Sequence, residues 1–375
     1  MKKNKKIGII IIALILIVGV IGLLTFLIKR SPIVMYEYYI NDNKVSIPGK
    51  HLVSYDCTNG VEISYDEKEY TYTTNNLKKD STCKLFFEEN IYDYLEDLGY
   101  SNDIIKEDNK VTRDSNNNTI YYSSSAKNNI YFNCSDYKDK STCEEWMIIG
   151  TKTFEDKKMV KIIRKNSISV KEKDSSNIIN KFSWNNTLGS DLSFDNSSLY
   201  NLLSTGYYLS INNYDYLDKD NNTKYVDFTN YGIKNDETRK MIIPSEYYVS
   251  KDSNINMRAE DYSLNESSGH SLNLAIGLPN ISDYVNSFGS TCSGENVANF
   301  SKCQGDSYMS INDGMWLMNV SSLDSSTVYR TLKGKAINPV YPTIEYEIYP
   351  VVYIDGNLKI ISGTGSSDDI YMIAY

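Results

Sequence analysis

Histidine is nearly absent from this sequence, since His51 and His270 are the only two in 375 residues. Few histidines are therefore available to serve as general bases or as metal ligands. Serine hydrolases with a nucleophile elbow are not expected either, because no Gly-Xaa-Ser-Xaa-Gly pentapeptide occurs. Basic residues are also fewer than acidic ones after residue 30. That part of the chain has 33 Lys and Arg and all 48 Asp and Glu, which gives a formal net charge of −15. A surface this acidic repels phosphate backbones, so we expect no nucleic-acid partner.

The N-terminus has one long apolar run. Ile7 to Ile28 form 22 residues with Thr25 as their only polar side chain, enough at about 1.5 Å per residue to cross roughly 30 Å of hydrocarbon. Four lysines precede the run, and only Lys29 and Arg30 follow it. The larger positive cluster is expected in the cytoplasm. The sequence thus predicts a single-pass signal anchor in the cell membrane with residues 31–375 outside the cell. The alternatives are a cleaved signal peptide and a type IV prepilin. This chain has no small-residue cleavage site after the apolar run, as a signal peptide would, and it lacks the glutamate expected shortly after the processing glycine of a prepilin.

All six cysteines lie on the predicted outer side of the membrane. An even number of cysteines in an exported chain indicates disulfides. The spacings of 26, 9 and 11 residues favour three local bridges: Cys57–Cys83, Cys134–Cys143 and Cys292–Cys303. A zinc site is the alternative, but no two of these cysteines have the two-to-four-residue spacing of zinc ligands.

The local composition and hydrophobic pattern of the chain predict an α+β fold and divide the sequence into four regions. Residues 1–30 are the basic tail and the transmembrane signal anchor. Residues 31–89 are a small β-sandwich-like module, because runs such as VEISY and EYTYTT are rich in β-branched and aromatic residues. Residues 90–127 are a short helix and a polar linker, with the linker or long loop at 101–118. Residues 128–375 are a loop-rich α+β domain.

Local signals predict individual elements. Three short helices are expected, capped by Asn90, Asp195 and Ser282. Strands are expected at NIYFN, EWMIIG, KMVKIIR, RKMIIP, GMWLMNV and TVYRTL. The Asp355-Gly356 dipeptide between YPVVYI and NLKIIS predicts a closing hairpin, with Pro350 at the beginning or edge of its strand.

Two segments resemble surface proteins of anaerobic low-GC Gram-positive bacteria. CTNGVEISYDEKEYTYTTNNLKKDSTCKLFF looks like a small β-module that recurs in those proteins, and the match covers most of residues 45–88. KNNIYFNC, STCEEWMIIG, SLYNLLSTGYY and YPVVYIDGNLKIISGTGSSDDIY are similar in order and spacing to an uncharacterised extracellular domain family of the same bacteria, over about 128–375. That resemblance implies a relation to C-type-lectin-like and formylglycine-generating-enzyme-like folds. It implies no activity.

Calcium is the one cofactor for which the sequence offers candidates. Asp218, Asp220 and Asn222 occupy positions one, three and five of a loop that starts like an EF-hand. Thr223 replaces the required glycine and Thr229 replaces the bidentate glutamate, so the EF-hand interpretation fails. An oxygen-rich loop that binds calcium and a solvated acidic turn are both compatible with what remains.

The search for a catalytic group finds none to assign. His51 and His270 are expected to be solvated, and the disulfides consume every thiol. Glu144-Glu145 before Trp146 is the most suggestive pair of carboxylates. The 33 tyrosines suit a contact surface, and the doublets Tyr207-Tyr208 and Tyr247-Tyr248 are candidates for exposed rings. We expect a membrane-anchored extracellular protein that binds a surface glycan or protein. The alternatives are an extracytoplasmic hydrolase that uses carboxylates and an envelope spacer without a ligand.

Overall fold

The structure is a computed structural model that describes residues 31–40, 43–45, 51–66, 71–189, 191–218, 222–249, 255–267, 270–309, 314–321, 326–332 and 335–375. The predicted membrane segment Ile7–Ile28 lies outside these residues. No helix in the described part of the chain is long and apolar enough to cross a membrane. The fold is mixed α+β, as expected, and consists mostly of strands in several small sheets with a few short helices.

The chain forms two compact units. Among the described residues, one contains residues 31–37 with Leu52–Leu85, and the other contains those of Tyr38–His51 and Phe86–Tyr375. The first six strands are β1 (Val34–Ile40), β2 (Asn43–Val45), β3 (His51–Cys57), β4 (Glu62–Asp66), β5 (Thr71–Asn75) and β6 (Ser81–Glu88). They make a four-stranded sheet of order β2-β1-β6-β3 and a separate β4-β5 pair. Every second residue of β6 is buried, including Cys83 and Leu85, so one face of this strand supplies core. A sandwich of the two sheets stays a prediction.

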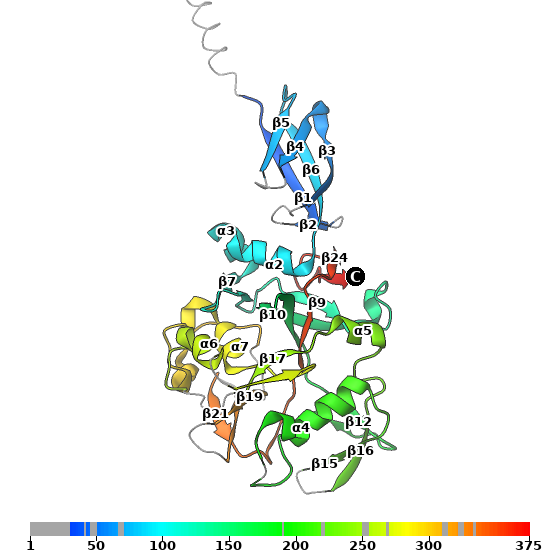
Figure 1. The fold of residues 1–375 in the computed structure, drawn as a ribbon, viewed down its shortest axis with the longest axis vertical. Helices are drawn as coiled ribbons and strands as arrows, with labels where there is room; N and C mark the ends of the chain where they lie inside the picture. The colour runs from blue at the N-terminus through cyan, green and yellow to red at the C-terminus, as the bar shows by residue number, and fades with distance from the viewer. Residues whose placement is uncertain are drawn as a thin grey trace, which may run out of the picture. The chain divides into compact units, whose positions relative to one another are not determined.

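The largest sheet lies in the second unit (Figure 1). Its strands run in the order β23-β11-β10-β8-β7, and β9 also pairs with β10. Their bounds are β7 Val111–Arg113, β8 Thr119–Tyr121, β9 Asn129–Phe132, β10 Glu144–Phe154, β11 Lys157–Arg164 and β23 Val351–Asp355. Glu155 and Asp156 join β10 to β11 with φ values of 48° and 62°, the left-handed geometry of a two-residue hairpin turn. Pro350 directly precedes β23, an edge strand, as predicted.

Strands β10, β11 and β23 are apolar on both faces and form the centre of the core. Trp146, Ile148, Val160, Ile162 and Val352 are all fully buried. A charged side chain inside such strands needs a partner, because burying an unpaired charge is costly. Lys161 is the exception that interrupts this apolar run in β11.

Smaller sheets and short helices surround this centre. The remaining strands are β12 Val170–Glu172, β13 Ile178–Ile179, β14 Phe182–Ser183, β15 Tyr214–Leu217, β16 Thr223–Asp227, β17 Ser245–Tyr248, β18 Ser271–Leu274, β19 Trp316–Val320, β20 Val328–Thr331, β21 Ile337–Val340, β22 Glu345–Tyr346, β24 Lys359–Ser362 and β25 Met372–Ala374. The helices are α2 Ile91–Tyr100, α3 Asp103–Asn109, α4 Ser198–Asn201, α5 Asp236–Met241, α6 Ala259–Ser267 and α7 Ile281–Asn286. Helices α6 and α7 are neighbours (Figure 1).

Helix α2 is where the sequence predicts it. The Asn90 side chain accepts a hydrogen bond from the Asp93 amide at 2.9 Å, as an N-cap does. The other two predicted caps are wrong. Asp195 lies in a 3-10 turn that precedes α4, and Ser197 is the residue that caps this helix. Helix α7 is capped by Asn280 and not by Ser282.

Three further predictions are corrected by the structure. The polar stretch 101–118 is not only a linker, because it contains α3 and β7. RKMIIP is not a strand: α5 ends at Met241, and its cap is Asn235, which accepts from the Thr238 amide at 2.9 Å. The two C-terminal strands do not pair as a hairpin, because β23 pairs with β11 and β24 pairs with β25.

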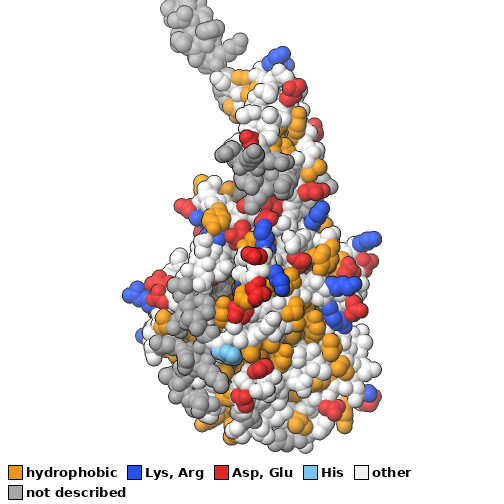
Figure 2. Space-filling model, in the orientation of Figure 1, with side chains coloured by type: hydrophobic (Ala, Val, Ile, Leu, Met, Phe, Trp, Pro, Cys, Tyr) orange, Lys and Arg blue, Asp and Glu red, His pale blue; other side chains and the backbone are white. Residues whose placement is uncertain are grey.

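Three disulfides join Cys57 to Cys83, Cys134 to Cys143 and Cys292 to Cys303, the pairs that the spacing predicts. No cysteine remains free. Disulfides persist in oxidising compartments, so this pattern is consistent with an extracytoplasmic protein. Basic and acidic side chains are interspersed on the visible face of the larger unit (Figure 2). The acidic excess is therefore not gathered into one patch on that face.

Candidate functional site

A polar pocket of about 350 Å³ opens in the larger unit. Strands β10, β11, β17 and β23, the β7–β8 turn, helices α6 and α7 and the segment before β19 all contribute to its lining. The lining residues are Asp114, Asn116, Asn118, Ile120, Tyr121, Ile149, Gly150, Thr151, Lys152, Thr153, Lys161, Tyr248, Glu266, Asn280, Ser282, Asp283, Asn286, Tyr308 and Tyr353. Its volume lies within the range of small-molecule sites.

Strand register places the key side chains on one face of the sheet. Gly150 of β10 pairs with Lys161 of β11, and Lys161 pairs with Tyr353 of β23. Paired residues, and residues two apart on one strand, share a face. Lys152 therefore lies on the same face as Lys161 and Tyr353. Gly150 is required there, since a Cβ at this position would lie 2.3 Å from the carbonyl oxygen of Thr119.

Lys161 and Asp283 form a buried ion pair in the lining of the pocket. The Lys161 Nζ atom lies 2.6 Å from Asp283 Oδ2, and the two side chains are only 11% and 9% exposed. The same Nζ is 3.3 Å from Asn280 Oδ1. Asp283 Oδ2 also accepts the Asn280 backbone N–H at 2.7 Å, completing a capping box at the start of α7. This cluster holds α7 against the sheet.

Lys152 has aromatic surroundings. Its Nζ atom lies 4.8 Å, 5.1 Å and 5.6 Å from the ring centroids of Tyr248, Tyr353 and Phe154, within the range of cation–π contacts. It donates to the carbonyl oxygen of Glu246 at 2.7 Å. Burial, with a smaller contribution from the charge of Lys161, lowers the pKa of Lys152 to about 8. At neutral pH its side chain is therefore largely an ammonium with few water contacts.

Glu266 of α6 is a buried acid in the same pocket. Its carboxyl accepts hydrogen bonds from the Ser282 hydroxyl and, at 2.6 Å, from the Asn319 amide. Burial, and to a lesser extent the nearby charge of Asp283, raises the pKa of Glu266 to about 7. This carboxyl is consequently about half protonated at neutral pH.

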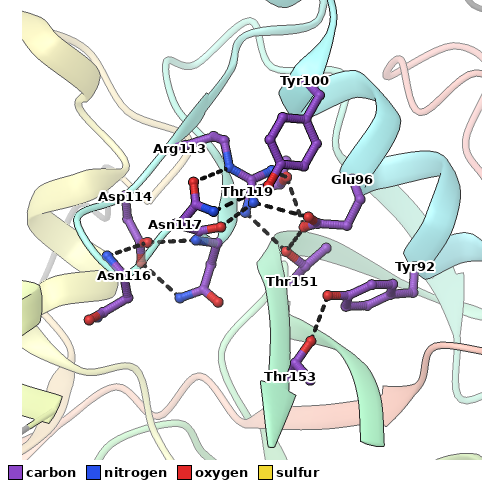
Figure 3. A network of polar contacts seen from close by, with 11 residues as sticks. Tyr92, Glu96, Tyr100, Arg113, Asp114, Asn116, Asn117, Thr119, Thr151 and Thr153 are labelled. Atoms are coloured by element: carbon purple, nitrogen blue, oxygen red, sulfur yellow. Dashed lines mark hydrogen bonds and ion pairs between the residues drawn. The ribbon is translucent and has the colours of Figure 1, made fainter. Parts of the chain in front are cut away.

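A network around Glu96 joins helix α2 to strands β7, β8 and β10 (Figure 3). Glu96 binds Arg113 Nη2 at 3.0 Å and the Thr119 hydroxyl at 3.0 Å. The Arg113 guanidinium lies 3.8 Å from the ring centroid of Tyr100. This network fixes strands β7 and β8 beside β10, and with them the turn that carries Asp114.

Asp114 closes that turn on itself. Its carboxylate accepts the backbone N–H groups of Asn116 and Asn118 at 2.9 Å and 2.8 Å, and the Asn118 amide at 3.2 Å. Burial raises the pKa of Asp114, while these hydrogen bonds oppose the shift. The carboxylate is thus engaged in its own turn, although it lines the pocket.

The hydroxyl of Tyr308, unlike the carboxylate of Asp114, is not engaged by a hydrogen bond in the described part of the chain. It is buried at the pocket and has no hydrogen-bond partner among the described residues. Buried hydroxyl groups normally have one. The pocket therefore combines an ammonium, an unsatisfied hydroxyl, several amides and tyrosine rings, a set of groups that can bind a polar ring with hydrogen-bonding substituents.

The calcium site proposed from the sequence stays a prediction, because only two of its three residues, Asp218 and Asn222, are described. Asp218 Oδ1 accepts the Asn222 backbone N–H at 2.8 Å, which closes the β15–β16 turn. Asp220 lies outside the described residues. Within the described ranges no three His, Cys, Asp or Glu side chains are grouped as metal ligands.

Both carboxylates of the Glu144-Glu145 doublet are engaged in ion pairs. Glu144 makes two contacts with the Arg164 guanidinium, at 3.0 Å and 3.1 Å, and Glu145 binds Lys165 Nζ at 2.7 Å. Successive residues of a strand point to opposite faces, so the two carboxylates diverge. His270 is exposed, and the structure does not describe the side chain of His51.

The prediction that both rings of each tyrosine doublet are exposed is wrong for one member of each doublet. Tyr207 and Tyr247 are buried in the core, at 0% and 1% exposure, so neither doublet is exposed as a whole. Tyr248 is the member that reaches the pocket.

The sequence did not reveal the pocket itself. A lysine within the apolar run around Lys161 was a usable signal, because a buried ammonium requires a partner. No signal in the linear sequence connected Lys152 with Tyr248, Glu266 or Tyr353. No protein-family model, curated protein or solved structure matches this chain. Its function is therefore inferred from the chemistry of the pocket.

Proposed function

We propose that this protein is anchored in the cell membrane by Ile7–Ile28 and that residues 31–375 lie outside the cell, where the pocket binds a surface glycan. The three disulfides support an exported chain. The resemblance to surface proteins of anaerobic low-GC Gram-positive bacteria has the same implication, and the C-type-lectin-like relation remains part of this proposal.

The observation that carries the binding proposal is the pairing of tyrosine rings with fixed polar groups in one pocket. Tyr248 and Tyr353 flank Lys152, and the polar side chains of Asn116, Asn280 and Ser282 line the same pocket. Sugars present apolar faces and a ring of hydroxyl groups, so they need such a combination of stacking and hydrogen bonding. An envelope spacer has no use for a pocket of this kind.

A glycan array probed with the full-length protein in detergent tests the proposal. Tyr248→Ala removes a half-buried ring from the pocket edge, and we expect it to reduce glycan retention by about tenfold, the value of one lost stacking contact. Tyr225→Ala on β16 is the matched control, since this tyrosine is 47% exposed and remote from the lining. Retention of no glycan, or equal loss in the two variants, contradicts the proposal.

A carboxylate hydrolase is the second candidate, favoured by one observation. Glu266, with its pKa of about 7, shares the pocket with Asp283, whose charge contributes to that shift. Glycoside hydrolysis uses a pair of carboxyl groups, one of which has a raised pKa and acts as the acid. However, Asp283 is bound to Lys161 and Glu266 to Ser282 and Asn319, which favours binding over catalysis. Cleavage of a retained glycan that disappears in Glu266→Gln while retention persists would establish the hydrolase.

A further inference from the structure

We infer that the ligand of this pocket carries an acidic group, a carboxylate or a phosphate, and that the ammonium of Lys152 binds it. The inference rests on the proposed binding function and adds the chemical class of the ligand. It follows from the charges in the lining, which are satisfied within the protein except at Lys152.

Each other charged group of the pocket has its own partner. Lys161 is neutralised by Asp283 at 2.6 Å. The Asp114 carboxylate accepts three hydrogen bonds from its own turn. Glu266 accepts two hydrogen bonds and is half protonated. None of them offers an unpaired cation to a ligand, since Lys161 is paired and Asp114 and Glu266 are acids.

Lys152 differs from these groups. It makes no ion pair with an acidic side chain of the described residues, and its one hydrogen-bond acceptor is the neutral carbonyl of Glu246. An ammonium has three donors, so two remain for a ligand. Hydrogen bonds between an ammonium and an anionic oxygen are short and stronger than neutral ones, most of all where water is scarce.

The neighbours of Lys152 define how such a ligand lies. Tyr248 and Tyr353 flank the ammonium, so a sugar ring can contact the tyrosines while its acidic substituent reaches Lys152. The buried hydroxyl of Tyr308 is a further donor in the same lining. Donors of this kind bind oxygen atoms without repelling negative charge, and they complete a site for an acidic sugar.

The test is a set of matched oligosaccharides on the array. Each neutral glycan is presented beside a counterpart that differs only by a uronic acid in place of glucose or by one phosphate ester, and the two acidic arms distinguish carboxylate from phosphate. We expect the full-length protein to retain an acidic member about tenfold more strongly than its neutral counterpart, the effect of one charge-assisted hydrogen bond. Lys152→Met removes this preference. Lys157→Met, an exposed lysine of the same hairpin, leaves it unchanged.

A second measurement reads Lys152 directly. With a pKa of about 8 this amine reacts with acylating reagents at pH 8 faster than ordinary surface lysines. Peptide mass spectrometry then follows its acetylation with glucuronic acid, inorganic phosphate or glucose added. Protection by either acid, but not by glucose, supports the inference.

The outcomes separate the two proposals. Equal retention of neutral and acidic glycans, with Lys152 unprotected, overturns the acidic ligand and leaves glycan binding intact. Protection of Lys152 by phosphate or glucuronic acid without retention of any glycan supports the anion site and overturns the glycan proposal. Unchanged preference in Lys152→Met overturns the role of this residue even where acidic glycans are bound.

Discussion

The buried ion pair between Lys161 and Asp283 sets the sharpest prediction for stability. Lys161→Met leaves the Asp283 carboxylate about one-tenth exposed and without its cation, while its bond to the Asn280 amide remains. Breaking a buried pair from one side costs about 3–5 kcal/mol, because the remaining charge is uncompensated. Asp283→Asn likewise leaves the buried ammonium of Lys161 without its carboxylate partner. The double variant removes both charges, so we expect it to lose at least 1 kcal/mol less than the sum of the two single losses.

Tryptophan fluorescence during urea unfolding measures these losses in the right part of the molecule. Trp146, Trp184 and Trp316 are the only tryptophans, and all are fully buried in the larger unit. Lys158→Met is the matched control: Lys158 also lies on β11, and its ion pair with Asp93 has side chains 45% and 21% exposed. Such a pair contributes less than about 1 kcal/mol. Equal losses for Lys161→Met and Lys158→Met, or additive losses in the double variant, would refute the reasoning.

Three other perturbations have defined outcomes in the same unfolding assay. Glu266 has a folded pKa of about 7 against an ordinary value of 4.5, so the folded state holds the extra proton between these values. Stability should therefore fall by on the order of 3 kcal/mol as the pH rises through that window, and Glu266→Gln should remove this slope. Gly150→Ala should cost about 1–3 kcal/mol through its contact with the Thr119 carbonyl, whereas Gly294→Ala, with nothing within 4 Å, should be nearly neutral. Replacing Cys134 and Cys143 by serine should lower stability by about 2.5 kcal/mol, the entropy of the loop they close; an unchanged midpoint would contradict this.

Packing in the core explains part of the abundance of tyrosine. Among the largest fully buried side chains are Tyr94, Tyr121, Tyr207, Tyr262 and Tyr371. Tyr94 and Tyr371 meet edge to face, with ring centroids 6.1 Å apart. Most of these rings therefore build the core, and only a few, Tyr248 and Tyr353 among them, reach the pocket. Composition alone does not separate the two uses.

Local signals predicted local structure well and pairing poorly. Asn90 and the apolar spacing of Ile91, Tyr94 and Leu95 were sufficient for α2, because the cap and the helix face lie within a few residues. The Asp355-Gly356 turn was misread, since β11 offers β23 a longer apolar partner than the strand that follows it. At α5, the Asn235 cap with acids in the first turn and bases in the last was a readable helix signal that the apolar run of RKMIIP concealed.

The sequence by itself determined the mixed α+β character, helix α2 with its Asn90 cap and the pairing of six cysteines, because these depend on composition or on residues close together in the chain. The pocket was decided only by tertiary structure. Lys152, Lys161 and Tyr353 come from three strands and Glu266 and Asp283 from two helices, spread over about 200 residues of sequence, and strand register places the three strand residues on one face beside the same pocket. Register depends on the summed burial of whole strands, and a shift of one residue would turn every one of these strand side chains to the opposite face.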